Sequence, residues 1–128
     1  MKSRRLGAFL GVIVWSVAVA AAGASLTTEA EGLRVEVKSE PEKPVTARKT
    51  TYTVRLFGTN GAPVTDARVT LTGRMADGMT AAAPLRASGE GIYRGAVLFT
   101  MKGQWDLAIR VVRPGHRFEV PLREEVAR

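Results

Sequence analysis

The feature that most constrains the fold is an alternation of apolar and polar residues that begins at Leu33 and recurs along the rest of the chain. A period of two places successive side chains on opposite faces, as in strands with one buried face. The pattern predicts about seven strands. Their apolar members are Leu33, Val35 and Val37; Tyr52, Val54 and Leu56; Ala67, Val69 and Leu71; Leu85 and Ala87; Tyr93, Val97, Phe99 and Met101; Trp105, Leu107, Ile109 and Val111; and Phe118, Val120 and Leu122.

Short segments rich in glycine, proline and asparagine separate these runs, at 41–44, 60–63, 89–91, 102–103 and 114–115. No segment after Ala24 has helical spacing. Short strands at intervals of about 8–12 residues, each with one apolar face, favour two antiparallel sheets that bury their inner faces against each other. We therefore predict an all-β fold, an immunoglobulin-like antiparallel β-sandwich over residues 33–126, with a small barrel as the alternative.

The N-terminus has the composition of an export signal. Lys2, Arg4 and Arg5 precede an uncharged apolar run over residues 6–24. The run ends in Ala-Gly-Ala, which fits the small-residue pattern of signal-peptide cleavage. A helix of that length also approaches the roughly 30 Å hydrocarbon thickness of a bilayer. Residues 1–24 are expected to form a hydrophobic helix that is either a cleaved signal peptide or a single transmembrane anchor.

Both alternatives place the rest of the chain outside the cytoplasm, because positive charge ahead of an apolar run stays on the cytoplasmic side. A retained anchor predicts a single-pass inner-membrane protein whose domain faces the periplasm or the cell exterior. Cleavage near Ala24 predicts a secreted or periplasmic protein. Residues 25–32 are expected to be a linker between the membrane and the sandwich. The chain has no cysteine, so packing alone must stabilise the exported domain.

Charge and length exclude several functional classes. The formal net charge of the 128 residues is +7, from 19 Lys and Arg against 12 Asp and Glu. Three of the basic residues precede the apolar run, so the rest of the chain has 16 Lys and Arg against 12 Asp and Glu. These cations are spread along the chain rather than gathered in runs, and few aromatic residues look exposed enough to stack on bases, which argues against nucleic-acid binding. The chain is also too short for a large enzyme.

Residues suited to catalysis are scarce. The one imidazole is that of His116, after the turn at 114–115, and no nucleophile pairs with it in sequence. Asp66, Asp77 and Asp106 lie in or near turns or alternate with core residues, where solvated or turn-capping roles prevail. We therefore expect that the protein is not an enzyme.

Met75 and Met79 are the candidate metal ligands, because they flank a polar, glycine-containing segment after the third run. Thioethers suit Cu(I), and a cysteine-free chain in an oxidising compartment has methionine and histidine as its copper-binding residues. The alternative is that Met75 ends a strand facing inward and Met79 covers the open end of the sandwich. Met101 continues the register of Phe99 and is assigned to the core.

Tyr93 and Trp105 lie on the apolar sides of their runs and are interpreted as core anchors. The Tyr93 hydroxyl is expected to be hydrogen-bonded at the end of a sheet, as in a tyrosine corner.

Residues 61–112 contain a spaced set of glycine, aromatic, apolar and methionine residues. They are Gly61, Ala62, Pro63, Val64, Ala67, Val69, Met75, Met79, Gly91, Tyr93, Gly95, Val97, Phe99, Met101, Gly103, Trp105, Asp106 and Leu107. Through these residues the segment resembles the YtkA-like and FixH-like families of small extracytoplasmic bacterial domains. The resemblance implies an immunoglobulin-like sandwich behind a signal or anchor, in a setting tied to copper delivery. FixH-like proteins are associated with a copper-transporting ATPase and with the assembly of haem–copper oxidases, and YtkA-like domains occur beside copper-resistance modules.

The resemblance therefore implies a non-enzymatic extracytoplasmic accessory protein, in copper handling or in the maturation of a haem–copper oxidase. Met75 and Met79 would be the Cu(I) ligands, although this chain has no histidine beside them. A copper-transporting ATPase or oxidase assembly proteins would be the partners, besides the membrane that holds the N-terminal segment. The alternative is a metal-free interaction module that docks on a membrane partner through a sheet edge or a loop.

Overall fold

The computed structural model describes residues 25–128, and the predicted hydrophobic helix over residues 1–24 lies outside the described residues. Between residues 25 and 128 no helix has the length and apolar character needed to cross a membrane. The described chain forms eight strands: β1 (Ser25–Ala30), β2 (Leu33–Glu40), β3 (Thr50–Gly58), β4 (Arg68–Arg74), β5 (Thr80–Gly89), β6 (Ile92–Val97), β7 (Gly103–Arg113) and β8 (His116–Val126).

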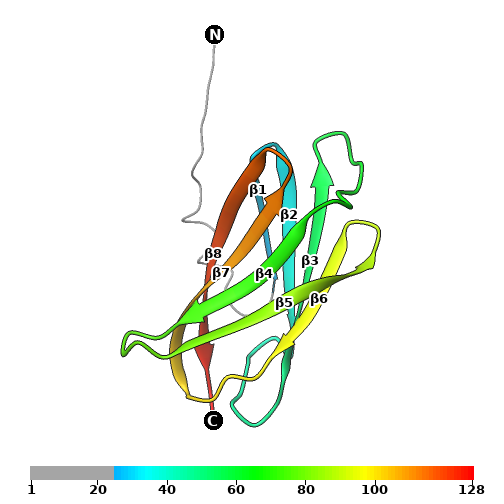
Figure 1. Ribbon diagram of the computed structural model, residues 1–128. Coiled ribbons are helices and arrows are strands. Elements are labelled where there is room, and N and C mark those ends of the chain that lie inside the picture. The colour runs from blue at the N-terminus through cyan, green and yellow to red at the C-terminus, as the bar shows by residue number, and fades with distance from the viewer. Residues whose placement is uncertain (1–24) are drawn as a thin grey trace.

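The strands pair in the order β1–β2–β3–β6–β5–β4–β7–β8, and all neighbouring strands are antiparallel. Strand β5 connects two sheets, because residues 80–85 pair with β4 whereas residues 86–89 pair with β6, with a shift in register between Ala87 and Gly89. The two sheets stack face to face (Figure 1). The predicted antiparallel β-sandwich is confirmed.

The space between the sheets is filled by the residues that alternate in the sequence. Each predicted run supplies buried side chains, and Val35, Val54 and Ile109 are among those fully enclosed. Tyr93 and Trp105 are also buried, which confirms their assignment as core anchors. The rings of Phe99 and Trp105 lie 5.3 Å apart with a tilt of 56°. Alternation along short strands therefore accounts for the core.

The segment expected to be a linker, residues 25–32, instead contains strand β1, which adds to the seven predicted strands. Strand β1 pairs with β2 from Ser25 opposite Lys38 to Ala30 opposite Leu33. Leu26 is buried in the core, while the next residue, Thr27, faces outward. The sequence suggested a linker because the segment has one large apolar residue. Main-chain hydrogen bonds to the edge of β2 hold such a polar strand in the sheet.

The alternating strand directions sort the connections into two ends of the sandwich. The proximal end, at the bottom of Figure 1, is where β1 begins and β8 ends, and it holds the β2–β3, β4–β5 and β6–β7 connections. The distal end, at the top, holds the β1–β2, β3–β4, β5–β6 and β7–β8 connections. Residues far apart in sequence therefore meet at each end.

Candidate functional site

Met75 and Met79 lie opposite each other in the hairpin that joins β4 to β5. The antiparallel register, with Arg74 opposite Thr80, continues to this pair, and the Met75 N–H donates to the Met79 carbonyl at 2.8 Å. Directly opposite residues project to the same face, with Cβ atoms about 4.5–5.5 Å apart. Residues 75 and 79 therefore share one face of the hairpin at the proximal end, where Met75 packs against the core and Met79 is exposed.

Backbone interactions hold this hairpin turn. The Gly78 N–H donates to the Met75 carbonyl at 3.0 Å, and Gly78 has a φ of 97°, which glycine adopts without strain. The Asp77 Oδ1 accepts from the Met79 N–H at 3.0 Å, which is the turn-capping role expected of Asp77. Because no methionine sulfur takes part, the thioethers can be replaced while these hydrogen bonds are kept.

The β6–β7 connection brings Met101 to the same end. A Cβ atom added at Gly103 would lie 2.9 Å from the Met75 Cε, so the Met75 methyl group lies close to the backbone just after Met101. The Met101 carbonyl accepts from the Trp105 indole N–H at 3.0 Å. The Met101 side chain is 43% exposed, so its assignment to the core is wrong. Strand β6 ends at Val97, and the connection beyond Phe99 no longer follows the strand register.

His116 lies at the distal end, away from the methionines. It begins β8 after the β7–β8 turn, and its Nδ1 is 3.6 Å from the Glu31 Oε1 in the β1–β2 turn. Asp106 forms an ion pair with Arg123 at 3.1 Å. In the part of the chain that the structure describes, no group of three or more His, Cys, Asp and Glu residues could hold a metal ion.

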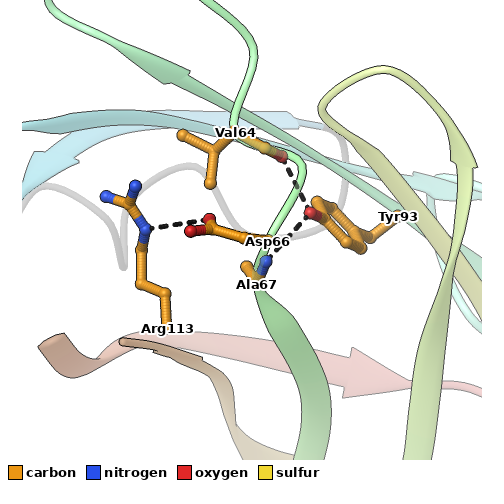
Figure 2. Close-up of polar contacts among 5 residues, drawn as sticks. All are labelled: Val64, Asp66, Ala67, Tyr93 and Arg113. Atoms are coloured by element: carbon orange, nitrogen blue, oxygen red, sulfur yellow. Dashed lines mark hydrogen bonds and ion pairs between the residues drawn. The ribbon is translucent and has the colours of Figure 1, made fainter. Parts of the chain in front are cut away.

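Tyr93 connects β6 to the β3–β4 connection. Its hydroxyl donates to the Val64 carbonyl at 2.8 Å and accepts from the Ala67 N–H at 3.4 Å (Figure 2). Beside it, the Arg113 Nε donates to the Asp66 Oδ1 at 3.3 Å. The hydrogen bonding expected of the Tyr93 hydroxyl is confirmed, and Asp66 has a structural partner.

A buried polar pair joins the two sheets. The Tyr52 hydroxyl, from β3, donates to the Glu124 Oε2, from β8, at 2.9 Å, and the two residues are 0% and 1% exposed. Burial raises the pKa of the Glu124 carboxyl, and the hydrogen bond from Tyr52 offsets part of that rise. Burial, together with the neighbouring Glu124, also raises the pKa of Tyr52. The sequence carried a signal for this pair, because Glu124 occupies an inward position between Leu122 and Val126.

An open groove of about 600 Å³ lies on the outer face of β2, β3 and β6. Lys38, Arg55 and Arg94 line it together with Glu40 and Glu42. Since both signs of charge are present, this groove indicates no single class of ligand. The proximal end, with its three methionines, is the stronger candidate site.

A profile of the YtkA-like family matches residues 27–110, which is more than half of the chain. The chain belongs to the YtkA-like family. In this YtkA-like protein the match extends from β1 into β7 and includes all three methionines of the proximal end. Strand β8, with Glu124, lies beyond it. No curated protein matches the sequence.

Solved structures similar to this YtkA-like chain share its fold. The filamin domain of Lin-41 aligns with a TM-score of 0.55 at 18% identity, covering 84% of this chain and 95% of the filamin domain. A DUF4426 family protein from Pseudomonas aeruginosa PAO1 aligns with a TM-score of 0.61 at 12% identity, covering 81% of this chain and 95% of that protein. At these identities the likeness concerns the fold alone.

Proposed function

We propose that this YtkA-like protein is a non-enzymatic accessory protein that works outside the cytoplasm and binds Cu(I) through Met75 and Met79. The register of the β4–β5 hairpin supports the proposal, because Met75 and Met79 are directly opposite each other and share one face. Thioether sulfur is a soft ligand that suits Cu(I). Met101, on the adjacent connection, offers a third thioether.

The proposed role is the transfer of copper, either in copper handling or in the maturation of a haem–copper oxidase. Its support is the FixH-like resemblance of residues 61–112, together with the partial exposure of Met79 and Met101, which leaves room for a partner to take the ion. The partners would be a copper-transporting ATPase or oxidase assembly proteins.

We infer that residues 1–24 take the domain out of the cytoplasm. The support is the order of Lys2, Arg4 and Arg5 before an uncharged run. The domain would then face the periplasm or the cell exterior on a single-pass inner-membrane anchor, or be released after cleavage near Ala24. Mass spectrometry of the mature protein distinguishes these states, since a released chain would begin near Ser25.

A Cu(I) titration of the full chain against a competing chromogenic chelator tests the proposed ligands. The double variant Met75→Leu/Met79→Leu keeps apolar bulk and removes both sulfurs, so binding should weaken by at least about tenfold, a free-energy loss of about 1.4 kcal/mol. Met101→Leu should weaken binding if its sulfur is the third ligand. Leu98→Ala, at the same end and without a ligand atom, is the control. Unchanged affinity in the double variant would refute the copper proposal.

A metal-free interaction module is the second candidate function. It is favoured by the exposure of Leu98 beside the methionines, because an exposed apolar side chain suits a protein contact as well as a metal site. A photo-crosslinker at position 98 tests it in native membranes. Crosslinking to the same partner at the same yield with and without the Met75→Leu/Met79→Leu substitutions would favour this function over copper binding.

A further inference from the structure

We propose that the proximal end of the sandwich docks on the surface of an anionic lipid bilayer. The proposal does not depend on Cu(I), because it rests on the exposed apolar and basic side chains of the proximal end.

The exposed large apolar side chains of residues 25–128 gather at the proximal end. They are Met79, Leu98 and Met101, with exposed fractions of 39%, 49% and 43%. Met79 lies at the β4–β5 hairpin, and the other two lie in the β6–β7 connection. Side chains of this kind on connections, rather than on a sheet face, can enter the interface of a bilayer without disturbing the strands.

The proximal connections also carry more basic than acidic residues. They hold Lys43, Arg48, Lys49 and Lys102 against Glu42 and Asp77. The distal connections carry Glu31, Asp66 and Glu90, with Arg68, Arg113 and Arg117 at the adjoining strand ends. Lys49 is next to Thr50, which pairs with Val97, so the register places it beside Leu98. Basic and apolar groups therefore occur side by side at the proximal end.

The course of the chain supports a bilayer as the occupant of this surface. Strand β1 begins towards the proximal end, with Ser25 opposite Lys38, two residues before the end of β2. Ser25 directly follows the uncharged apolar run over residues 6–24. When that run is held in a membrane, the proximal end is the part of the sandwich closest to the lipid. Each Lys or Arg near an anionic surface then strengthens the contact by about fivefold.

Site-specific fluorescence on the full chain in vesicles tests the docking. The chain has no cysteine, so Leu98→Cys gives one site for an environment-sensitive NBD label. Arg117→Cys, near the distal end of β8, is the matched control. The 11 residues of β8 span about 35 Å at the usual strand rise, which keeps the control label away from lipid even when the chain is anchored. The vesicles contain phosphatidylcholine with or without phosphatidylglycerol, and a lipid with a nitroxide on its acyl chain as the quencher.

In vesicles with phosphatidylglycerol we expect quenching at position 98 to exceed that at position 117 at least threefold. The substitutions Lys49→Gln and Lys102→Gln should reduce the excess, as should high salt. Equal quenching at the two positions would overturn the proposal. The proposal would also be overturned if the excess were equally large in vesicles of pure phosphatidylcholine and unaffected by the glutamine substitutions. Since the vesicles contain no other protein, a protein partner cannot produce the signal, and far-UV circular dichroism verifies that each variant is folded.

Discussion

Replacing Tyr52 with phenylalanine should destabilise the fold by about 1.5–3 kcal/mol at pH values where the Glu124 carboxyl is ionised, the usual contribution of a hydrogen bond to a charged group. The substitution removes only the hydroxyl that donates to the Glu124 Oε2 at 2.9 Å and keeps the buried ring in place. Because both residues are buried, the lost donor is not replaced by bulk water. For a domain of this size the melting temperature should fall by more than about 6 °C.

The loss should depend on pH, with a sign set by the pKa of Glu124. Burial raises that pKa, so the folded state binds the proton more tightly than the unfolded state. The carboxyl therefore contributes stability below its unfolded pKa, and this stability is lost as pH rises through the folded pKa. The Tyr52 hydroxyl lowers the pKa of Glu124 and limits the loss. Without the hydroxyl, the destabilisation should be larger at about pH 8 than at about pH 4.

Urea unfolding of the full chain, followed by far-UV circular dichroism across this pH range, measures the effect. The variants are Tyr52→Phe, Glu124→Gln and the double substitution. In the Glu124→Gln background the loss of the hydroxyl should cost only about 0.5–1.5 kcal/mol and should not vary with pH. The reasoning is refuted if Tyr52→Phe costs the same at both ends of the pH range while Glu124 is present.

Two further substitutions test the distal end. Gly91→Ala should lower the melting temperature by more than Gly115→Ala. Both glycines have positive φ, of 72° and 78°, but only a Cβ at Gly91 would lie 2.8 Å from the Leu56 carbonyl oxygen. Equal shifts in melting temperature would show that this close approach is relieved at no cost. Tyr93→Phe should cost about 0.5–1.5 kcal/mol in urea unfolding, since it removes the hydrogen bond to the Val64 carbonyl, and wild-type stability would contradict that role.

The strands were predictable because their signal is local. Residues such as Val35, Val54 and Ile109 alternate with polar neighbours, and burial of one face requires only that each strand join a sheet. Strand β1 escaped prediction because its place depends on the free edge of β2 rather than on its own composition. Met101 was misassigned because the alternation continues in the sequence past Val97, where the strand has already ended.

The candidate site was also predictable from the sequence only in part. Met75 and Met79 are separated by a short turn with Gly78, so their proximity follows from local hairpin geometry, and their role as Cu(I) ligands stays a prediction. The approach of Met75 to Gly103 joins the β4–β5 connection to the start of β7, which is distant in sequence. That contact exists because β4 pairs with β7.

The sequence by itself determined seven of the eight strands, and it placed Met75 and Met79 on either side of a short connection, because each of these features depends on residues a few positions apart. Only the tertiary structure decided the Tyr52–Glu124 bridge, the place of β1 and the position of Met101. These features depend on the order in which strands pair, and on the passage of β5 from one sheet to the other. Strand order follows from the packing of the whole core, to which every strand contributes, so no single segment encodes it.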